Sequence, residues 1–519
     1  MFLFLSRTHR LGRFLIAVAP LLWMGHAPLS AMAGPVPEAA DRAKPLNILY
    51  IVADDFGIMD TSVYNPDTFY ETPNLDRLAA SGMVFERGYV PNPICTPSRY
   101  ALMTGRYPTR AQVTNFSGGK RLGRFLQADF HKRLPLEEIT IGELLEEVGY
   151  RTAFFGKWHL GPSEAYYPES HGFDLNVGGN FRGGPGSGKG YFAPFENPQL
   201  QPESPPGDHL PDRLAREVNA FMEADPDQPF LACLNFYSVH TPLMGRPDLV
   251  AKYEKKAKSV QGEAFGQAEL VFSFHPKAPE QANRTERTER ILQKHAVYAA
   301  MVEAMDEAIG KVLRKLEALG LAGNTLVIFT SDHGGLSTRQ GSPTSPIPTS
   351  NRPFRGGKGW LYEGGVRVPL MIRYPGVTAS GSTYAAPVST LDLYPMIAAA
   401  VGAGIRHEID GVDLTPVLEG GRIDRGPLYW HFPHYSNEGG FPGGAILDGD
   451  WKLIQRYEDG AVQLYDVVED ISEQDDLAPQ HPEQVEAMRA ELHRWLRDQN
   501  ARFLRQRPEP GSPEPWRPY

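Results

Sequence analysis

Residues 46–55, LNILYIVADD, indicate the class of fold that the chain adopts. The stretch is apolar and rich in β-branched residues until it ends in two carboxylates, and such runs are typical of strands buried on both faces of a parallel sheet. Asp54 and Asp55 then follow the carboxyl end of the strand. Because open α/β sheets bind their ligands at that end, the two aspartates are the first candidate site residues.

The same pattern recurs along the chain. TPNLDRLAASG and ITIGELLEEVG predict helices that stop at glycine, and YRTAFFGKWHL predicts a strand that runs into a polar loop. A periodic segment from about Arg290 to Leu319 predicts a long helix ahead of a strand in NTLVIFTSDHGG. This alternation predicts a doubly wound α/β domain with a large mixed or parallel sheet and helices on both faces. The Gly- and Pro-rich stretches 181–208 and 334–365 predict loops.

The pattern changes at about residue 405. GPLYWHFPHY, GAILDGDWKLIQRY and AVQLYDV predict short strands separated by turns, and a helix follows from about Pro482 to Asn500. We therefore expect a large domain over 34–404 and a smaller C-terminal domain over 405–506, with a short antiparallel sheet and one helix. The Pro-rich end, 507–519, predicts a disordered tail.

The first residues predict export. MFLFLSRTHRLGR is basic, an uncharged apolar run follows, and Ala31-Met32-Ala33 supplies small residues at the spacing of a signal-peptidase site. We expect a signal peptide over 1–33 and a periplasmic or secreted protein. The apolar run is shorter than the ~20 residues that span a membrane, and no later segment is apolar enough to do so.

Charge and cysteine content narrow the function further. A net charge of -10 and a pI of about 5.9 give no electrostatic reason to expect a nucleic-acid partner, and nothing in the sequence specifies an oligomeric state. Two cysteines in an exported protein ordinarily pair. Cys233, however, lies in an apolar run that predicts a buried strand, whereas Cys95 lies in the Pro-rich stretch NPICTPSRYALMTGRYPTR. These contexts argue against a disulfide, so Cys95 needs another explanation.

Polar residues gather where the predicted strands end. They are Asp54 and Asp55, Lys157 and His159 in GKWH, His240 in YSVHTP, and Asp332 and His333 in SDHGG. Strand-end aspartates often only cap helices or accept backbone hydrogen bonds, so the agreement in position is what marks a site. Three carboxylates beside a neutral donor suit a hard divalent cation, calcium or magnesium. Lys157, His159, His240, Arg99 and Lys358 add the positive charge and donors that a tetrahedral oxyanion requires.

These motifs match a known family. CTPSR, residues 95–99, has the Cys-x-Pro-x-Arg pattern of type I sulfatases, and TGRYP resembles the second half of the same signature. The aspartate pair, GKWH, SVHTP, SDHGG and GGKG stand in the family's order. The chain therefore resembles the formylglycine-dependent sulfatases of the alkaline-phosphatase-like superfamily over nearly its whole mature length.

The resemblance implies a cofactor and a cation. In this family a formylglycine-generating maturation enzyme oxidises the cysteine to Cα-formylglycine, whose hydrate is the nucleophile, so Cys95 would be its precursor. Calcium, or magnesium, would be held by Asp54, Asp55, Asp332 and His333 together with modified residue 95. Many relatives carry Asn at the position of His333, although the pair Asp-His also occurs.

The resemblance also implies residue roles. Arg99 would hold the formylglycine hydroxyls, Lys157 and Lys358 would bind sulfate oxygens, and His240 with Lys358 would assist the leaving alcohol. Asp332 would accept a proton from the attacking hydroxyl, and His159 would accept one when the covalent sulfate is expelled. The implied function is a sulfuric ester hydrolase acting on a sulfated carbohydrate or aryl sulfate.

Three alternatives remain. A phosphonate monoester or phosphodiester hydrolase can use the same modified cysteine, but such enzymes tend to depart from the double carboxylate that ADD retains. A non-catalytic protein that binds sulfated glycans would not need every matched polar position intact. A Cys-His thiol hydrolase would not need a cluster of carboxylates beside its thiolate. The loop YWHFPHYSNEGG could stack on a sugar, unless Trp430 and Tyr435 are core residues of the small sheet.

Overall fold

The computed structural model describes residues 44–119, 123–186, 188, 190–267, 271–272, 284–285, 288–339 and 344–518. The predicted signal peptide, 1–33, lies outside these residues. Within the described ranges, no helix is both long enough and apolar enough to cross a membrane.

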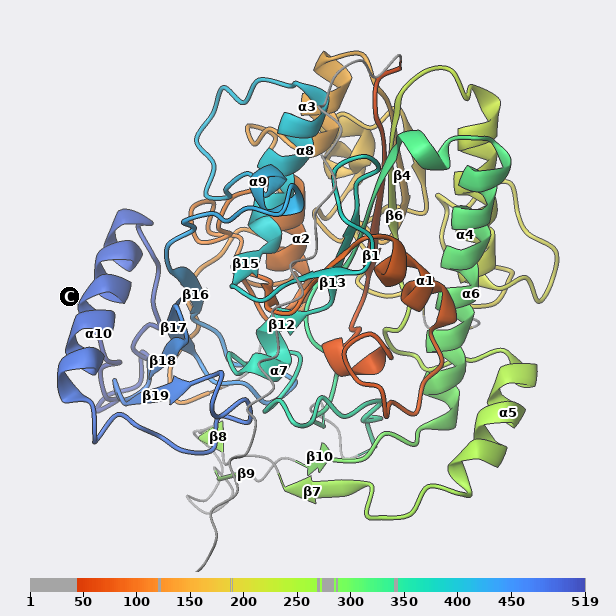
Figure 1. Ribbon diagram of the computed structural model, residues 1–519. Helices are drawn as coiled ribbons and strands as arrows, with labels where there is room; N and C mark the ends of the chain where they lie inside the picture. The colour runs from red at the N-terminus through yellow and green to blue at the C-terminus, as the bar shows by residue number, and fades with distance from the viewer. Residues whose placement is uncertain are drawn as a thin grey trace, which may run out of the picture. The chain divides into compact units, whose positions relative to one another are not determined.

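A mixed sheet forms the centre of the large domain (Figure 1). Its eight strands lie in the order β14 (Ser382–Tyr384), β2 (Met83–Phe85), β13 (Leu370–Arg373), β11 (Thr325–Ser331), β1 (Asn47–Ala53), β6 (Phe230–Asn235), β4 (Arg151–Gly156) and β5 (Leu175–Val177). The strands from β11 to β5 are parallel to one another, and β13 runs antiparallel to β11. The sheet is thus the mixed one that the sequence predicts.

Helices cover both faces of this sheet, as Figure 1 shows for α4 and α6 on one side and α2 and α8 on the other. Alternate residues of β1 point to opposite faces: Leu49 and Ile51 join one core, and Ile48 and Tyr50 join the other. The first core also takes residues from α1 (Pro73–Ser81), α4 (Leu210–Ala224), α5 (Pro247–Ala257) and α6 (Ala296–Ala318). The second takes residues from α2 (Cys95–Thr104), α3 (Ile141–Glu147), α8 (Leu393–Val401) and α9 (Thr415–Leu418).

The predicted start of the long helix is wrong. α6 begins at Ala296 instead of near Arg290, because Thr288–Arg290 forms strand β10 and pairs with β7 (Phe265–Gln267). His295 ends the extended segment and caps the helix, since its Nδ1 accepts a hydrogen bond from Tyr298 N at 3.3 Å. Apolar periodicity does not show where a strand gives way to a helix.

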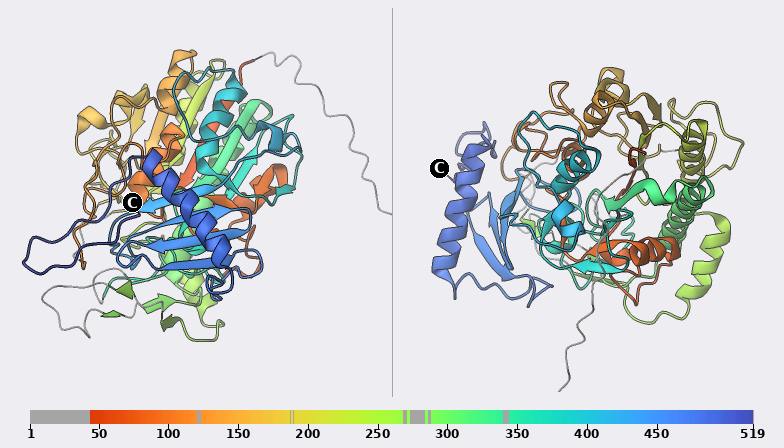
Figure 2. Two further views of the ribbon diagram at one scale, coloured as in Figure 1. Left: turned by 90° about the vertical axis from the view of Figure 1, so that its left-hand side faces the viewer. Right: turned by 45° about the horizontal axis from the view of Figure 1, so that its top comes forward.

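The small sheet is antiparallel and has one covering helix, as predicted. Its strands are β16 (Leu428–Phe432), β17 (Gly443–Asp448), β18 (Trp451–Arg456) and β19 (Val462–Asp466). Figure 2 shows α10 (Pro482–Asp498) lying across these strands. Leu492 and Trp495 of α10 pack on one face of the sheet. The other face packs against Tyr89, Trp360 and Tyr362 of the large domain.

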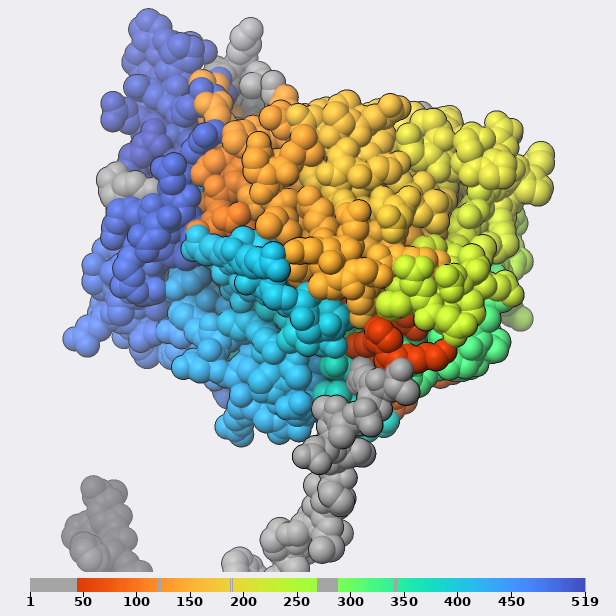
Figure 3. Space-filling view, turned by 90° about the horizontal axis from the view of Figure 1, so that it is seen from above, coloured from red at the N-terminus to blue at the C-terminus, as the bar shows by residue number. Residues whose placement is uncertain are grey.

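The domain bounds remain predictions. α9 lies past the predicted boundary near residue 404, yet its Val417 and Leu418 pack with the large sheet. In the segment expected to be disordered, Trp516 stacks on Tyr457 with 6.0 Å between ring centroids. In Figure 3, which looks onto the end where the parallel strands begin, the red start of the described chain reaches the surface.

The remaining elements are short. They are α7 (Glu363–Val366), the sheet of β12 (Arg367–Val368), β3 (Gly88–Tyr89) and β15 (Val388–Ser389), the pair β8 (Val271–Phe272) and β9 (Arg284–Thr285), and the 3-10 turns Ile58–Asp60, Glu164–Tyr166, Pro168–His171, Ala322–Asn324 and Thr390–Asp392.

Candidate active site

Four neighbouring parallel strands end level with one another, and this brings the candidate residues together. In the register, Ala53 of β1 lies opposite Ser331 of β11, and Asn235 of β6 lies opposite both Val52 and Gly156. The residues that follow these ends are Asp54 and Asp55, Asp332 and His333, Lys157 and His159, and His240. These residues therefore gather at the carboxyl ends of parallel strands on both sides of β1. Open α/β sheets bind their ligands at this edge.

Helix α2 brings Cys95 to this edge. Cys95 is its first residue, and Ile94 before it is extended, so the thiol faces the strand ends from the helix N-terminus. Pro97 fits the first turn because that turn needs no N–H from it. Arg99, one turn further on, is buried and its Nε donates to Asp332 Oδ2 at 2.9 Å.

Three buried aspartates converge near the thiol. One ligand atom each from Asp54, Cys95, Asp332 and His333 lie within 4.8 Å of one another, and the same holds for Asp55, Cys95 and His240. Cys95 Sγ lies 3.2 Å from His333 Nε2 and 3.9 Å from Asp54 Oδ1. His333 Nε2 also lies 3.3 Å from Asp55 Oδ1.

These residues fit a hard divalent cation. Burial raises the pKa of Asp54 well above its usual range, against the charge of Lys157, so the ionised carboxylate needs more positive charge than the chain supplies. Burial lowers the pKa of His333, but Asp332, Cys95 and Asp55 outweigh it and raise that pKa to about 9. His333 Nδ1 donates to Gly334 O at 3.0 Å, so the proton that a bound cation would displace is on Nε2, facing the carboxylates. A set of carboxylate oxygens with one imidazole nitrogen suits calcium or magnesium better than zinc.

Two lysines complete the charge pattern. Lys157 Nζ donates to Asp54 Oδ2 and Lys358 Nζ donates to Asp55 Oδ1, both at 2.7 Å. Burial alone would raise the pKa of Asp55, but Lys358, His240 and His333 outweigh it and lower that pKa to about 2. The same balance holds at Cys95, where burial raises the thiol pKa but Lys157, Lys358 and His333 hold it well below its usual range. The position of residue 95 therefore favours negative charge.

Two histidines border the cluster. Burial lowers the pKa of His159, and it lowers the pKa of His240 to about 4, so both rings are neutral at pH 7. His240 Nδ1 donates to Thr241 O at 2.7 Å and its Nε2 lies 4.0 Å from Asp55 Oδ2. His159 has a φ of 59°, and its Nδ1 has no hydrogen-bond partner among the described residues.

The cluster borders a pocket of about 930 Å³. Cys95, His159, His240 and Lys358 line the pocket beside the cluster. Its other walls come from loops, at 116–118, 181–186, 241–242, 345–346 and 437–438. Since the pocket is much larger than a sulfate group, it can hold part of the alcohol as well.

Sequence reasoning missed Asn235. Its Oδ1 accepts a hydrogen bond from Arg99 Nη1 at 3.2 Å, and its backbone oxygen accepts one from Lys157 N at 2.8 Å. The sequence did contain a signal for Asn235: it is a polar residue at the end of an apolar strand, β6, just as Asp54 directly follows β1. A polar residue at every parallel strand end therefore belongs on a candidate list.

The aromatic loop has a different role from the sugar platform that we considered. Trp430 and Tyr435 are buried; Trp430 Nε1 donates to Val90 O and Tyr435 OH donates to Glu458 Oε1, each at 2.7 Å. The loop still reaches the pocket, through residues 437 and 438. Cys95 and Cys233 are both free, as their contexts predict, and both are buried.

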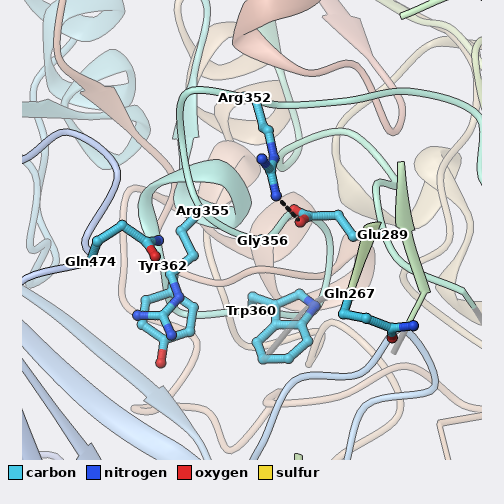
Figure 4. Close-up of a pocket in the computed structure, with 8 residues that line it drawn as sticks. All are labelled: Gln267, Glu289, Arg352, Arg355, Gly356, Trp360, Tyr362 and Gln474. Carbon is cyan, nitrogen blue, oxygen red and sulfur yellow. Dashed lines mark hydrogen bonds and ion pairs between the residues drawn. The ribbon is translucent and has the colours of Figure 1, made fainter. Parts of the chain in front are cut away.

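A second pocket, of about 280 Å³, is lined by Arg355, Gly356 and Trp360, which flank Lys358 in the sequence (Figure 4). Arg355 places its guanidinium over the Tyr362 ring, with 4.2 Å from Cζ to the centroid, and Arg352 bonds Glu289 at 3.2 Å. Trp360, drawn beside them, donates from Nε1 to Thr338 Oγ1 at 3.0 Å. These contacts fix the segment on either side of Lys358.

A doubly wound sheet that carries a buried thiol, a carboxylate cluster suited to a cation and two lysines at one edge is an arrangement typical of hydrolases of oxyanion esters. Comparison with known proteins agrees. The protein-family model for Sulfatase matches residues 46–403, and the model for N-sulphoglucosamine sulphohydrolase, C-terminal, matches residues 356–502. The chain therefore belongs to the sulfatase family and is a sulfuric ester hydrolase, and the family implies a formylglycine and a divalent metal.

Individual relatives support this assignment. A sulfatase of Formosa agariphila is 32% identical over an alignment of 544 positions, and this alignment covers 89% of this chain and 90% of the relative. Arylsulfatase A of Homo sapiens is 34% identical over 412 residues, 76% of this chain and 72% of that protein. The crystal structure of Ps i-CgsB in complex with k-i-k-neocarrahexaose is 28% identical with a TM-score of 0.67, covering 87% of this chain and 93% of that one. A phosphonate monoester hydrolase of Agrobacterium radiobacter, 20% identical with a TM-score of 0.60, shares the fold.

Proposed function

We propose that this enzyme removes sulfate from a sulfated saccharide, with residue 95 as its nucleophile after conversion to formylglycine. The observation that carries the proposal is the convergence of Cys95, three buried aspartates, His333 and two lysines beside a pocket of about 930 Å³. The sugar class is supported by the i-CgsB relative, whose structure holds a neocarrahexaose, and by the match to the N-sulphoglucosamine sulphohydrolase C-terminal model.

The chain's residues would hold two groups. Asp54, Asp55, Asp332 and His333 would hold a calcium or magnesium ion, which supplies positive charge to the sulfate and to the nucleophile. A hydrated formylglycine supplies one hydroxyl for attack on sulfur and a second whose deprotonation releases the sulfate. In the structure, Cys95 Sγ stands where those hydroxyl oxygens would lie.

The basic residues neutralise and orient the anion. A sulfate monoester repels an anionic nucleophile, so Lys157 and Lys358, now on Asp54 and Asp55, would turn to sulfate oxygens when substrate binds. Arg99 is fixed by Asp332, by Asn235 and by the Lys157 carbonyl oxygen, at 2.9, 3.2 and 2.7 Å. Held in this way, its guanidinium would orient the hydroxyls of residue 95.

The remaining polar groups would move protons. Asp332 would accept the proton of the attacking hydroxyl. His159, which lies close enough to affect the pKa of the Cys95 thiol, would accept the second proton through a ring that burial keeps neutral. His240 and Lys358 would stabilise the leaving alcohol oxygen from the open side of the pocket.

We also propose that the protein is exported and acts in the periplasm or outside the cell, where polymeric sulfated saccharides are accessible. The support is the signal-peptide pattern of the first 33 residues. Its maturation partner would be a formylglycine-generating enzyme, which must meet the CTPSR segment before folding, because Cys95 and Arg99 are buried in the folded protein.

The second candidate activity, phosphonate monoester hydrolysis, is favoured only by the fold shared with the Agrobacterium radiobacter enzyme. Rates on p-nitrophenyl sulfate and p-nitrophenyl phenylphosphonate separate the two. We expect the sulfate to be the better substrate in kcat/KM, and a preference for the phosphonate would overturn the assignment.

A substitution at Cys95 tests the nucleophile. A serine can attack sulfur but lacks the second hydroxyl, so we expect Cys95→Ser to release at most one equivalent of p-nitrophenol per active site and then to stop. Cys233→Ala, which removes the other buried cysteine, is the matched control and keeps steady-state turnover. Normal turnover by Cys95→Ser would contradict the proposal.

A further inference from the structure

The wall of the active-site pocket includes the loop segment Phe181–Gly184. This segment lies against both histidines: a β-carbon on Gly183 would come within 2.7 Å of His159 Cε1, and one on Gly184 within 3.3 Å of His240 Nδ1. The glycines therefore let the backbone pass close to the reacting groups. Arg182, directly before them, is placed next to the site where the alcohol leaves.

A hydrogen bond holds the backbone of Arg182, whereas its guanidinium has only weak partners among the described residues. Asn180 Oδ1 accepts a hydrogen bond from Arg182 N at 2.8 Å. The side chain is 33% exposed, and its buried Nε has no hydrogen-bond partner in the part of the chain that the structure describes. Its ion pair with Glu196 is long, with 3.9 Å between Nη1 and Oε2. A buried donor without a partner is unfavourable, and a bound acceptor would offset that cost.

A guanidinium offers five donors in a planar fork that matches the oxygens of a sulfate or carboxylate. Phe181, beside Arg182, is 51% exposed, an unusual exposure for a large aromatic side chain in a pocket wall. The Arg182 Cζ lies 5.8 Å from the centroid of this ring. A cation next to an exposed aromatic face suits a sugar ring that carries an anionic substituent.

We propose that Arg182 binds a second anionic group, a sulfate or a carboxylate, on a saccharide whose scissile sulfate lies at residue 95. This inference rests on the proposed function and deepens it. The preferred substrate is then a saccharide with at least two negative groups, with its sugar ring packed on Phe181. Arg182 sets specificity and takes no part in bond breaking.

The test compares a ligand that has many anionic groups with a substrate that has one. Sucrose octasulfate carries a sulfate at every hydroxyl position, so it needs no knowledge of the natural linkage, and its inhibition constant is measured against p-nitrophenyl sulfate. We expect Arg182→Gln to raise that constant about tenfold more than it raises the KM for p-nitrophenyl sulfate, because charged hydrogen bonds are lost. Arg182→Lys should recover part of the affinity.

Two further variants sharpen the test. Glu196→Gln removes the carboxylate that competes for Arg182, so it should lower the inhibition constant. Arg406→Gln removes an arginine that is 80% exposed and paired with Glu147, and we expect it to leave both constants within twofold of wild type. Trigalacturonate, which has carboxylates only, shows which anion Arg182 prefers.

Calorimetric titration of sucrose octasulfate into Cys95→Ala and Cys95→Ala/Arg182→Gln proteins repeats the comparison without catalysis. Absence of turnover by matured wild-type enzyme, with binding that depends on Arg182, would contradict the proposed function alone. Equal binding by the two proteins, an effect of Arg406→Gln as large as that of Arg182→Gln, or no binding by Cys95→Ala would overturn the inference.

Discussion

Three aspartates share one buried site, and each meets a different cation of the chain: Asp54 meets Lys157, Asp55 meets Lys358 and Asp332 meets Arg99. Carboxylates this close repel one another unless positive charge lies between them. In the proposed mechanism the lysines turn toward sulfate when substrate binds, and a divalent cation then holds the carboxylates ionised. Catalysis and cation binding should therefore fail together.

Removing one carboxylate should reveal this dependence. We expect Asp332→Ala to lower calcium affinity by at least about 100-fold, because calcium affinity follows the number and charge of the oxygen ligands, and to abolish turnover. Calorimetric titration of the EDTA-treated protein measures the affinity. Asp212→Ala, a partly exposed carboxylate that pairs with Lys311, is the control. Full activity of the EDTA-treated wild-type enzyme in EDTA would refute the cation's role.

His240 should matter in proportion to the difficulty of the leaving group. p-Nitrophenolate leaves readily, whereas a sugar hydroxyl needs its developing charge stabilised. We expect His240→Gln to lower kcat on p-nitrophenyl sulfate by less than about fivefold and on a saccharide sulfate by about 100-fold or more. Equal losses on the two substrates would show that His240 acts elsewhere in the reaction.

Several site residues could be found from the sequence because each follows a predicted strand or belongs to a short motif. Arg182 could not, since nothing in a Gly-rich loop shows which side chain faces a pocket. Trp430 and Tyr435 illustrate the reverse case. From the sequence alone, an aromatic loop suits a sugar platform and a buried core equally well. Only the fold shows that these two rings belong to the core.

At the scale of elements, the polar ends of β1, β11, β6 and β4 became one site because the strands are parallel neighbours in register. Apolar runs predicted these strands, and the alternation with helices predicted the doubly wound sheet. The start of α6 was misplaced because the strand β10 depends on pairing with β7, a contact that sequence periodicity does not carry.

Helix α1 depends on a residue of α6. The Asp306 carboxylate accepts hydrogen bonds from Asn74 N and Leu75 N, at 2.9 to 3.1 Å, at the N-terminus of α1. Asp306→Ala leaves these N–H groups unpaired, so we expect a loss of about 1–3 kcal/mol in the free energy of unfolding, with KM unchanged. Urea unfolding measures the loss.

The control is Glu317→Ala on the same helix. The Glu317 side chain is 52% exposed, and its ion pair with Arg77, at 3.5 Å, lies at the surface. Because exposed ion pairs contribute little, we expect Glu317→Ala to lower the free energy of unfolding by less than about 0.5 kcal/mol. If the two variants have equal stability, α1 does not need the Asp306 cap.

At the scale of the whole molecule, the small sheet is part of the active site's support. One face packs on Trp360 and Tyr362, in the segment that continues from Lys358. Lys452 of β18 bonds Glu363 and Glu473 at 2.9 and 3.0 Å, with all three buried. The sequence predicted the small sheet but not the contact of Lys452 with Glu363, because these two residues lie 89 positions apart in the chain.

Glu458 gives the contact between the domains a pH dependence. Tyr435 OH donates to it at 2.7 Å and accepts from Phe125 N of the large domain at 3.1 Å. Burial raises the pKa of Glu458 from 4.5 to about 7. Between these values the folded state holds a proton that the unfolded state has released, so this group's contribution to stability falls as pH rises through that window.

Glu458→Gln keeps the oxygen that accepts from Tyr435 and removes the titration. Relative to wild type, we expect it to gain stability between pH 5 and pH 8 by on the order of 2 kcal/mol, measured by urea unfolding at both values. If the difference in unfolding free energy between Glu458→Gln and wild type is the same at pH 5 and pH 8, Glu458 is ionised in the folded state over this whole range.

The central claim is that residue 95 is a formylglycine, and mass spectrometry of one tryptic peptide tests it directly. The peptide runs from Gly88 to Arg99, GYVPNPICTPSR, and is taken from protein produced together with a formylglycine-generating enzyme. We predict an aldehyde in place of the thiol at residue 95, in proportion to the specific activity of each preparation. An unmodified cysteine in fully active, cation-dependent enzyme would contradict the account.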